Sequence, residues 1–339
     1  MHKTVDRIIL QNRFKLIWIV CIFALSACSG VISEPDKSIR HAIEGTYAAD
    51  ISADSKLAVV STAQQGILVW DLVEQTEKYK WSHQEEGHVN NTVGIVHIAA
   101  DSSYVVTADR EAFALWNLSS GEPEGFWRID EASVRDIAVS NNGRGVLVGR
   151  GNGKAMFFEP ATGRRLEFLG HQEKINSVDI SPNGFYALTG GNDYVAYLWD
   201  TRSGQVIHRF THSSRVTKVA LDDLGRYAFT ADSKRGARIW NVQTGEEISQ
   251  LSYIQRQKIF SVATFSEDGK YLATGSPGRA LNLWSVETGS EVQEWRVTPK
   301  EGTQPQSAVV YAVSFNQNNQ LLSESSSGLA EYWPFEQED

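Results

Sequence analysis

An aromatic residue recurs along this chain of 339 residues at intervals of 41 to 49 positions. The recurring residues are Trp70, Trp116, Phe158, Trp199, Trp240, Trp284 and Trp333. A second signal keeps the same spacing, because five positions after most of these residues stands a glycine that follows Ser or Thr. These glycines are Gly121, Gly163, Gly204, Gly245 and Gly289. Two signals in phase predict an internal repeat of seven units.

One unit indicates what each repeat folds into. Val178 and Ile180 alternate with polar residues, as in a β-strand. Pro182 and Gly184 then form a tight turn, because proline fixes φ and glycine tolerates positive φ. Three further short strands are expected within residues 185–210. Four antiparallel strands in about 40 residues make one blade of a β-propeller, so we predict an all-β, seven-bladed β-propeller of four-stranded antiparallel blades.

A third signal concerns the outer strands. Eleven positions after the aromatic residue stands an apolar residue that we expect to anchor the outer strand of its blade. These residues are Trp81, Trp127, Leu169, Phe210, Leu251 and Trp295.

The last blade has only three strands before the chain stops at Asp339. They are expected between residues 309 and 333, whereas residues 38–43 read as a lone outer strand near the other end. We therefore expect this N-terminal strand to close the last blade, which removes exposed sheet edges. The predicted propeller spans residues 38–335 and is followed by a short tail, residues 336–339.

His171, Thr189, Asp193 and Trp199, the last followed by Asp200, resemble the pattern of the WD-repeat family. In that family the four residues form a chain of hydrogen bonds that holds the blade together. Such a network suits buried polar groups, which need partners. The resemblance implies a structural network rather than a catalytic His–Asp pair, because no nucleophile stands where it would complete a site.

The other repeats depart from this pattern. Apart from the histidine of that network, only His88 and His212 stand in a loop that leads into a blade. The position of Asp193 holds Lys234 in the next repeat and Gly278 in the one after. We therefore expect the whole network in one blade and mainly apolar packing in the others.

The N-terminal segment is typical of a secretory signal. Four basic residues precede an apolar run over residues 16–25, which is shorter than the roughly 20 residues that a membrane span needs. Residues 25–28, Leu-Ser-Ala-Cys, resemble the lipobox of bacterial lipoproteins. The resemblance implies that residues 1–27 are a signal peptide and that Cys28 carries lipid. An ordinary signal peptide with a chance cysteine is the alternative.

Ser29 bears on localisation. Under the sorting rule known for such lipoproteins, an aspartate there would retain the protein at the inner membrane, so Ser29 favours the periplasmic face of the outer membrane. Residues 28–37 would then be the lipidated cysteine and a short tether. The lipid on Cys28 would attach the protein to this membrane.

Charge and cysteine content exclude several classes of protein. Four of the 32 basic residues and one of the 41 acidic residues lie in residues 1–27, so the mature chain would have 28 basic and 40 acidic residues, a net charge of −12. Such a surface is repelled by nucleic acid and anionic lipid, so we expect no nucleic-acid partner. Cys21 lies in the signal peptide and Cys28 would carry lipid, which leaves no thiol for a zinc site or a disulfide.

No motif for catalysis stands out. The sequence has no phosphate-binding glycine loop, no HExxH and no nucleophile elbow, and the glycine-rich residues 149–153 are expected in a turn between strands. We therefore expect no catalytic residue, no cofactor and no metal. An enzyme or small-ligand binder that uses the central channel is the competing hypothesis.

The connections between strands define two faces of the predicted propeller. The loops that lead into each blade and the turns between second and third strands share one face, called the loop face here. The turns between first and second strands and between third and fourth strands share the other, the turn face. Basic residues expected on the loop face are candidates to bind a partner: Arg110, Arg150, Lys174, Arg215, Lys234, Arg235 and Arg279.

The turn face is expected to be acidic, with Asp222, Asp223, Glu267 and Asp268 among its residues. The loop face is mixed in charge and carries long loops, where binding often resides. We therefore predict a monomeric, non-enzymatic scaffold that is lipid-anchored and binds an envelope protein or peptide through its loop face. Ordinary solvated turns without a binding role are the alternative for either face.

Overall fold

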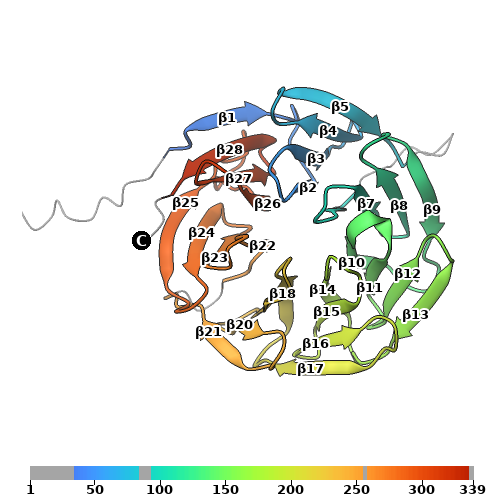
Figure 1. Ribbon diagram of the computed structural model, residues 1–339. Helices are drawn as coiled ribbons and strands as arrows, with labels where there is room; N and C mark the ends of the chain where they lie inside the picture. Colours follow the sequence, from blue (N-terminus) through green and yellow to red (C-terminus); the bar gives the residue numbers. More distant parts are fainter. Residues whose placement is uncertain (1–33, 84–92, 255–257, 336–339) are drawn as a thin grey trace, which may run out of the picture. The chain divides into compact units, whose positions relative to one another are not determined.

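The computed structural model describes residues 34–83, 93–254 and 258–335. From Pro35 onward the described chain forms one unit, which contains strands β1 to β28 and one short 3-10 helix, η1 (Asn141–Gly143). Seven four-stranded antiparallel sheets follow one another around a ring, as the colours of Figure 1 show from β1 to β28. This arrangement confirms the predicted seven-bladed β-propeller.

Several predicted segments lie outside the described residues. They are the signal peptide (1–27), Cys28 with most of the tether, residues 84–92 of a long loop and the tail (336–339). Lys37, the last residue of the predicted tether, begins β1. Among the residues that are described, no helix has the length and apolar character needed to cross a membrane.

Six blades are built from consecutive strands. Blade 1 comprises β2 (Ala48–Ile51), β3 (Leu57–Ser61), β4 (Ile67–Asp71) and β5 (Thr76–Trp81). Blade 2 comprises β6 (Ile95–Ile98), β7 (Tyr104–Ala108), β8 (Ala112–Asn117) and β9 (Pro123–Arg128). Blade 3 comprises β10 (Val134–Val139), β11 (Val146–Arg150), β12 (Ala155–Glu159) and β13 (Arg164–Phe168).

Blades 4 to 6 repeat the same order. Blade 4 comprises β14 (Ile175–Ile180), β15 (Tyr186–Gly191), β16 (Val195–Asp200) and β17 (Val206–Thr211). Blade 5 comprises β18 (Val216–Leu221), β19 (Tyr227–Asp232), β20 (Ala237–Asn241) and β21 (Glu247–Gln250). Blade 6 comprises β22 (Val262–Phe265), β23 (Tyr271–Gly275), β24 (Ala280–Ser285) and β25 (Glu291–Arg296). In each blade the first strand lines the central channel and the fourth lies at the rim (Figure 1).

Blade 7 joins the two ends of the chain. It comprises β26 (Val310–Phe315), β27 (Gln320–Ser325), β28 (Leu329–Pro334) and β1 (Lys37–Arg40). The closing strand pairs antiparallel with β28, with Lys37 opposite Tyr332. This confirms the predicted closure, although the strand ends at Arg40 instead of residue 43. The chain turns away there because the backbone N–H groups of His41 and Ala42 both bond to the carbonyl oxygen of Gly328, at 2.9 and 3.2 Å.

The recurring aromatic residue packs between blades. In four places it meets an aromatic ring from the outer strand of the preceding blade. The pairs are Trp81–Trp116, Trp127–Phe158, Phe168–Trp199 and Phe210–Trp240, with ring centroids 4.8, 5.1, 4.6 and 4.5 Å apart. Aromatic pairs at such distances add to the stability that burial alone provides. The repeat of about 40 residues in the sequence is therefore the repeat of a contact between neighbouring blades.

One predicted anchor of an outer strand is wrong. Leu169 is 67% exposed, and Phe168 takes its place in the core against Trp199. The reason is a missing β-bulge. In the other five blades built wholly from consecutive strands, the pairing of third and fourth strands shifts by one residue at the recurring aromatic. In blade 3, Phe158 pairs with Arg165 without such a shift, so its anchor comes one residue earlier.

Candidate functional site

The loop face holds most of the basic candidates in the positions expected for them. Because neighbouring strands are antiparallel, the loops before first strands and the turns between second and third strands lie at one end of each blade. The side chains of Arg110, Lys174, Arg215, Lys234 and Arg235 are exposed there. Arg279 is partly exposed, and its Nε donates a hydrogen bond to the carbonyl oxygen of Val297 at 2.8 Å.

Arg150 was predicted as a candidate to bind a partner, and its burial corrects that prediction. It is only 3% exposed, because it ends β11, a fully buried strand. Its guanidinium group pairs with Glu131, at 3.4 Å, and with Glu167. The hydrogen bond from Arg150 holds the pKa of Glu167 below its usual value. Arg150 is therefore the buried member of an ion-pair cluster in blade 3, and exposed carboxylates lie between it and solvent.

Three of the exposed candidates meet at the corner between blades 5 and 6. The backbone N–H of Ser233 bonds to the carbonyl oxygen of Arg215 at 3.0 Å, which joins the two connections of blade 5. Arg235 donates from Nη2 to the carbonyl oxygen of Ile254 at 3.1 Å. The hydroxyl of Tyr253 reaches the carbonyl oxygen of Lys234 at 3.4 Å. We call Arg215, Lys234, Arg235 and Ile254 the corner cluster.

Exposed apolar side chains also gather on the loop face. Ile254 is 94% exposed and Ile43 is 76% exposed. In the described chain, the other large apolar side chains exposed in loop-face connections are Tyr47, Leu169, Tyr194 and Ile259. Among the residues that the structure describes, the turn-face connections expose two, Val73 and Leu224. Sequence reasoning missed this asymmetry, although apolar residues inside the connecting loops were its visible signal.

The predicted network in blade 4 forms in part. His171 lies with Nδ1 3.0 Å from both carboxylate oxygens of Asp193 and with Nε2 2.9 Å from Oγ1 of Thr189. The indole N–H of Trp199 is buried and has no hydrogen-bond partner among the described residues. Burial alone would raise the pKa of Asp193, but the hydrogen bond and charge of His171 outweigh it and lower that pKa. The His171 side chain is fully buried, so it has no access to a substrate.

Similar networks form in two other blades, which corrects the expectation of a single one. In blade 5, Thr230 Oγ1 lies 2.8 Å from His212 Nε2 and accepts the indole N–H of Trp240 at 2.7 Å. Asp232 stands 3.5 Å from His212. The sequence pattern placed the acidic residue of this network at position 234, which holds a lysine, whereas the structure has it two residues earlier. The second and third strands pair in the same register in both blades, with Thr189 opposite Tyr197 and Thr230 opposite Arg238. The acid stands four residues after the threonine in blade 4 and two residues after it in blade 5.

Blade 2 has the third network. Thr107 Oγ1 lies 2.7 Å from His83 Nε2 and accepts the indole N–H of Trp116 at 2.8 Å. The carboxylate of Asp109 stands 3.7 Å from His83. The predicted histidine of this blade, His88, lies outside the described residues. Because a long loop follows His83, the spacing of the repeat did not identify it as the histidine of this network.

The central channel carries a set of acidic side chains that the sequence did not reveal. The cavity of about 180 Å³ is lined by the first strands of all seven blades. Asp50 accepts the N–H of Ile98 in the next blade at 2.7 Å, and Asp179 accepts that of Leu221 at 2.7 Å. The same connection is made by Asp136 to Val178 at 2.9 Å.

These contacts give the channel carboxylates a structural role. Strand edges that face the channel present backbone N–H groups without a neighbouring strand, and buried donors need partners. The carboxylates supply those partners and link blade to blade. In the part of the chain that is described, no group of three or more His, Cys, Asp and Glu side chains has the arrangement of a metal site.

Titration in the channel reflects its crowded charges. Burial would lower the pKa of His97, but the carboxylates of Asp179, Asp50 and Asp136 raise it. Asp223 is exposed by surface area, yet its carboxyl group lines the channel cavity among many atoms. Desolvation there, followed by the carboxylates of Asp179 and Asp222, raises the pKa of Asp223 to about 6.

The turn face is less acidic than expected. Asp222 is buried and binds Arg226, which donates from Nε at 2.8 Å and from Nη2 at 2.7 Å. Three further arginines, Arg144, Arg164 and Arg202, lie at the edge shared by blades 3 and 4. The acidic residues of this face therefore cover only part of it.

Fold and side chains together define a β-propeller in which three blades contain a buried His–Thr contact and aromatic pairs link neighbouring blades. The family model "WD domain, G-beta repeat" matches residues 163–200 and 249–285. The chain thus carries WD40 repeats on a seven-bladed propeller, and propellers of this kind generally bind protein partners. No curated protein matches the chain.

Proposed function

We propose that this protein is a non-enzymatic scaffold that is anchored by lipid in the bacterial envelope and binds a protein or peptide through its loop face. The observation that carries the proposal is the corner cluster. Ile254 is almost completely exposed there, and its carbonyl oxygen is held by Arg235.

An exposed aliphatic side chain beside arginines has the composition of a binding hot spot. Arginine is enriched among residues that dominate interface energies, and apolar side chains become favourable when a partner removes them from water. The asymmetry between the two faces supports the same choice. Six of the exposed large apolar side chains described here lie in loop-face connections, against two in turn-face connections.

The scaffold also limits the entropy that binding would cost. Blade 5 and the loop beyond it are connected by the hydrogen bonds of Arg215, Lys234 and Arg235 described above. Groups held in place before binding lose little freedom when a partner arrives.

The anchor and the location are inferred from the sequence. The segment that ends in Leu25-Ser26-Ala27-Cys28 supports lipidation of Cys28, and Ser29 supports the periplasmic face of the outer membrane. β1 begins at Lys37, nine residue steps after Cys28, which gives a reach of roughly 30 Å at full extension. The propeller would therefore stay near its membrane, as a monomer.

The channel supports a scaffold more than an enzyme. Three of the four carboxylates that line it, Asp50, Asp136 and Asp179, already accept backbone hydrogen bonds from neighbouring blades, and the fourth is Asp223. A catalytic carboxylate needs a free oxygen that can reach a substrate proton.

Site-specific photo-crosslinking in living cells tests the proposal. A photoreactive residue replaces Ile254 in the corner cluster or, in a matched variant, Val73, which is 64% exposed on the turn face. We expect a crosslinked protein band from position 254 and a weaker one or none from position 73. Equal bands, or a band from position 73 alone, would show that the loop face is not the docking face.

A further inference from the structure

Two guanidinium groups lie against one phenylalanine ring at the edge shared by blades 3 and 4. The guanidinium carbons of Arg144 and Arg202 each lie 4.6 Å from the ring centroid of Phe185. All three residues lie in connections of the turn face, between first and second strands or between third and fourth strands. We call Arg144, Phe185 and Arg202 the arginine–phenylalanine patch.

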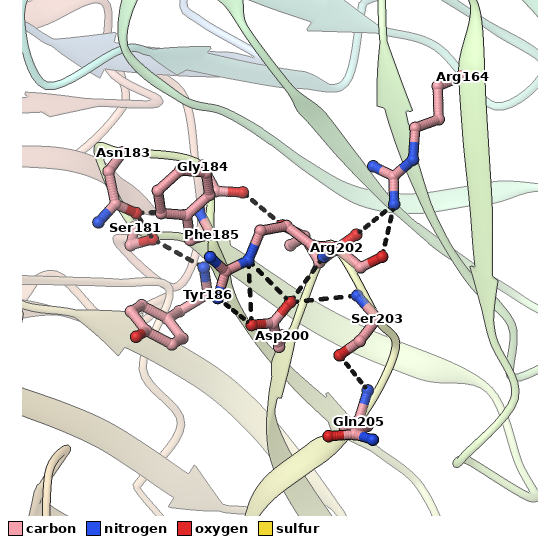
Figure 2. Close-up of polar contacts among 11 residues, drawn as sticks. Arg164, Ser181, Asn183, Gly184, Phe185, Tyr186, Asp200, Arg202, Ser203 and Gln205 are labelled. Carbon is pink, nitrogen blue, oxygen red and sulfur yellow. Dashed lines mark hydrogen bonds and ion pairs between the residues drawn. The ribbon is translucent and has the colours of Figure 1, made fainter.

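Arg202 is fixed in place by its neighbours, as Figure 2 shows. Its Nε lies 3.2 Å from both carboxylate oxygens of Asp200, and its Nη2 bonds to the same group. Hydrogen bonds from Arg202 hold the pKa of Asp200 at about 2. Arg164 clamps the turn from the other side, since its Nη2 donates to the carbonyl oxygens of Thr201 and Arg202 at 3.2 and 2.8 Å.

Arg144 has no such acidic partner. Its side chain is exposed, and among the described residues no carboxylate lies within ion-pair distance of it. The turn that carries it is nevertheless rigid. The N–H of Asn141 bonds to the carbonyl oxygen of Pro182 in the next blade at 2.9 Å, and η1 follows directly. Arg144 thus offers free N–H donors from a fixed position.

The local charge is positive although the chain as a whole is acidic. Arg144, Arg164, Arg165 and Arg202 stand near three carboxylates: Glu159, Asp200 and Asp101, which accepts the backbone N–H of Asn142 at 3.0 Å. This surplus of one positive charge contrasts with the net charge of −9 for the whole sequence. Salt screens more distant charges over about 8 Å, so a small ligand would respond mainly to the local surplus.

We propose that the arginine–phenylalanine patch is a second docking surface, which binds an acidic peptide segment of a partner protein. Guanidinium groups match carboxylates through paired N–H···O hydrogen bonds, and arginine with an aromatic platform is typical of interface hot spots. A protein with docking surfaces on both faces would bridge two partners. This inference does not depend on the loop face.

The surroundings of the patch favour a short acidic segment over an anionic membrane. Asp101, Asp223, Glu267 and Asp268 are exposed on the same face. A flat anionic membrane surface would approach these carboxylates at the same time as the arginines. A single peptide segment can contact the patch and avoid them.

The test uses the full chain with Cys28→Ala and a short fluorescein-labelled peptide of consecutive glutamates. Fluorescence anisotropy should show binding of this peptide, weakened by added salt, and no binding of the matching glutamine peptide. Arg144→Gln combined with Arg202→Gln should weaken binding about tenfold to a hundredfold, as expected for lost charge-assisted hydrogen bonds. Phe185→Leu keeps both charges and should weaken binding to a smaller extent.

The matched control is Arg209→Gln combined with Arg296→Gln, which removes two exposed charges from the rim strands β17 and β25. Its affinity should stay within about twofold of the parent, well under the 1.4 kcal/mol that a tenfold change requires. Melting curves establish that each variant is folded. No binding of the glutamate peptide, or equal weakening in both double variants, would overturn the proposal. One further result would overturn the proposal: the peptide does not bind, but phosphatidylglycerol vesicles do, and Arg144→Gln combined with Arg202→Gln abolishes vesicle binding. Crosslinking at position 254 reports on the loop face separately.

Discussion

Nδ1 of His41 forms a hydrogen bond with Oε1 of Glu324, and both side chains are buried. His41 directly follows the closing strand β1, and Glu324 belongs to β27 of the same blade. The imidazole ring also stacks on Trp70 of blade 1, with ring centroids 4.6 Å apart and planes 12° apart. One side chain therefore connects the N-terminal strand, the last blade and the first blade.

The contact between His41 and Glu324 predicts that loss of the His41 side chain lowers the free energy of unfolding. His41→Ala removes the partner of a buried carboxyl group and the stacking on Trp70. Breaking such a buried pair costs about 3–5 kcal/mol, so urea unfolding should show a loss of that order. The control is Arg40→Ala, which removes an exposed ion pair with Glu301 and should cost no more than about 1 kcal/mol. Similar losses in the two variants would mean that His41 does not secure the closure.

Asp193 predicts a pH dependence of stability. Its folded-state pKa lies below the ordinary value of 3.8, so the group stabilises the fold above pH 3.8 and this contribution is lost as the pH falls through the folded-state pKa. Asp193→Asn should therefore unfold about 1–3 kcal/mol more easily than the parent at pH 7, since it weakens the bonds to His171. The difference should shrink at acid pH. A constant difference from pH 7 to pH 3 would contradict this origin.

Asp223 predicts the opposite dependence of stability on pH. Its folded-state pKa is raised to about 6, above the ordinary value of 3.8. The associated stability is complete below pH 3.8 and is lost as the pH rises through 6. Asp223→Asn should consequently melt at a higher temperature than the parent at pH 8 and at a similar temperature below pH 3.8. Direct titration by NMR of the Asp223 carboxyl carbon would contradict this if its pKa were ordinary.

The repeat made the fold predictable from the sequence. The spacing of Trp70 to Trp333 predicts seven blades, and in four places it corresponds to an aromatic contact between neighbouring blades. The closure was predicted from the lone strand near the N-terminus. The errors come from local shifts that spacing does not encode. Phe168 replaces Leu169 because blade 3 lacks a bulge. Asp232 replaces Lys234 because the acid of blade 5 stands two residues after Thr230, whereas Asp193 stands four residues after Thr189.

The sequence predicted on which face of the propeller the candidate residues lie, but not which of their side chains are available to a partner. Strand order alone places Arg110, Arg215 and Arg235 at one end of their blades. Whether a charge is available depends on its neighbours in three dimensions. Arg150 looked equivalent in the sequence, yet Glu131 and Glu167 enclose it. Likewise, the channel carboxylates meet N–H groups that are more than 40 residues away in the chain, which no local pattern indicates.

The lipid anchor is a separate prediction. Cys28→Ala should prevent lipidation and leave an uncleaved precursor or a soluble protein. Intact mass and membrane fractionation measure both properties, and globomycin treatment of the parent should also prevent normal processing. If neither the substitution nor the inhibitor changes mass or fractionation, Cys28 is not a lipidation site.

Partner capture by charge-reversed variants tests the loop-face proposal most directly. Arg110, Arg215 and Arg235 are changed together to Glu, while Arg150 is left intact because it is buried. We predict that crosslinking from position 254 falls strongly while the melting temperature stays close to that of the parent, because these side chains are exposed and rim charges govern association. The matched turn-face variant changes Asp223, Glu267 and Asp268 to Lys and should retain the crosslink. Retention of the crosslink in the loop-face variant, or its loss in the turn-face variant alone, would contradict the proposed docking face.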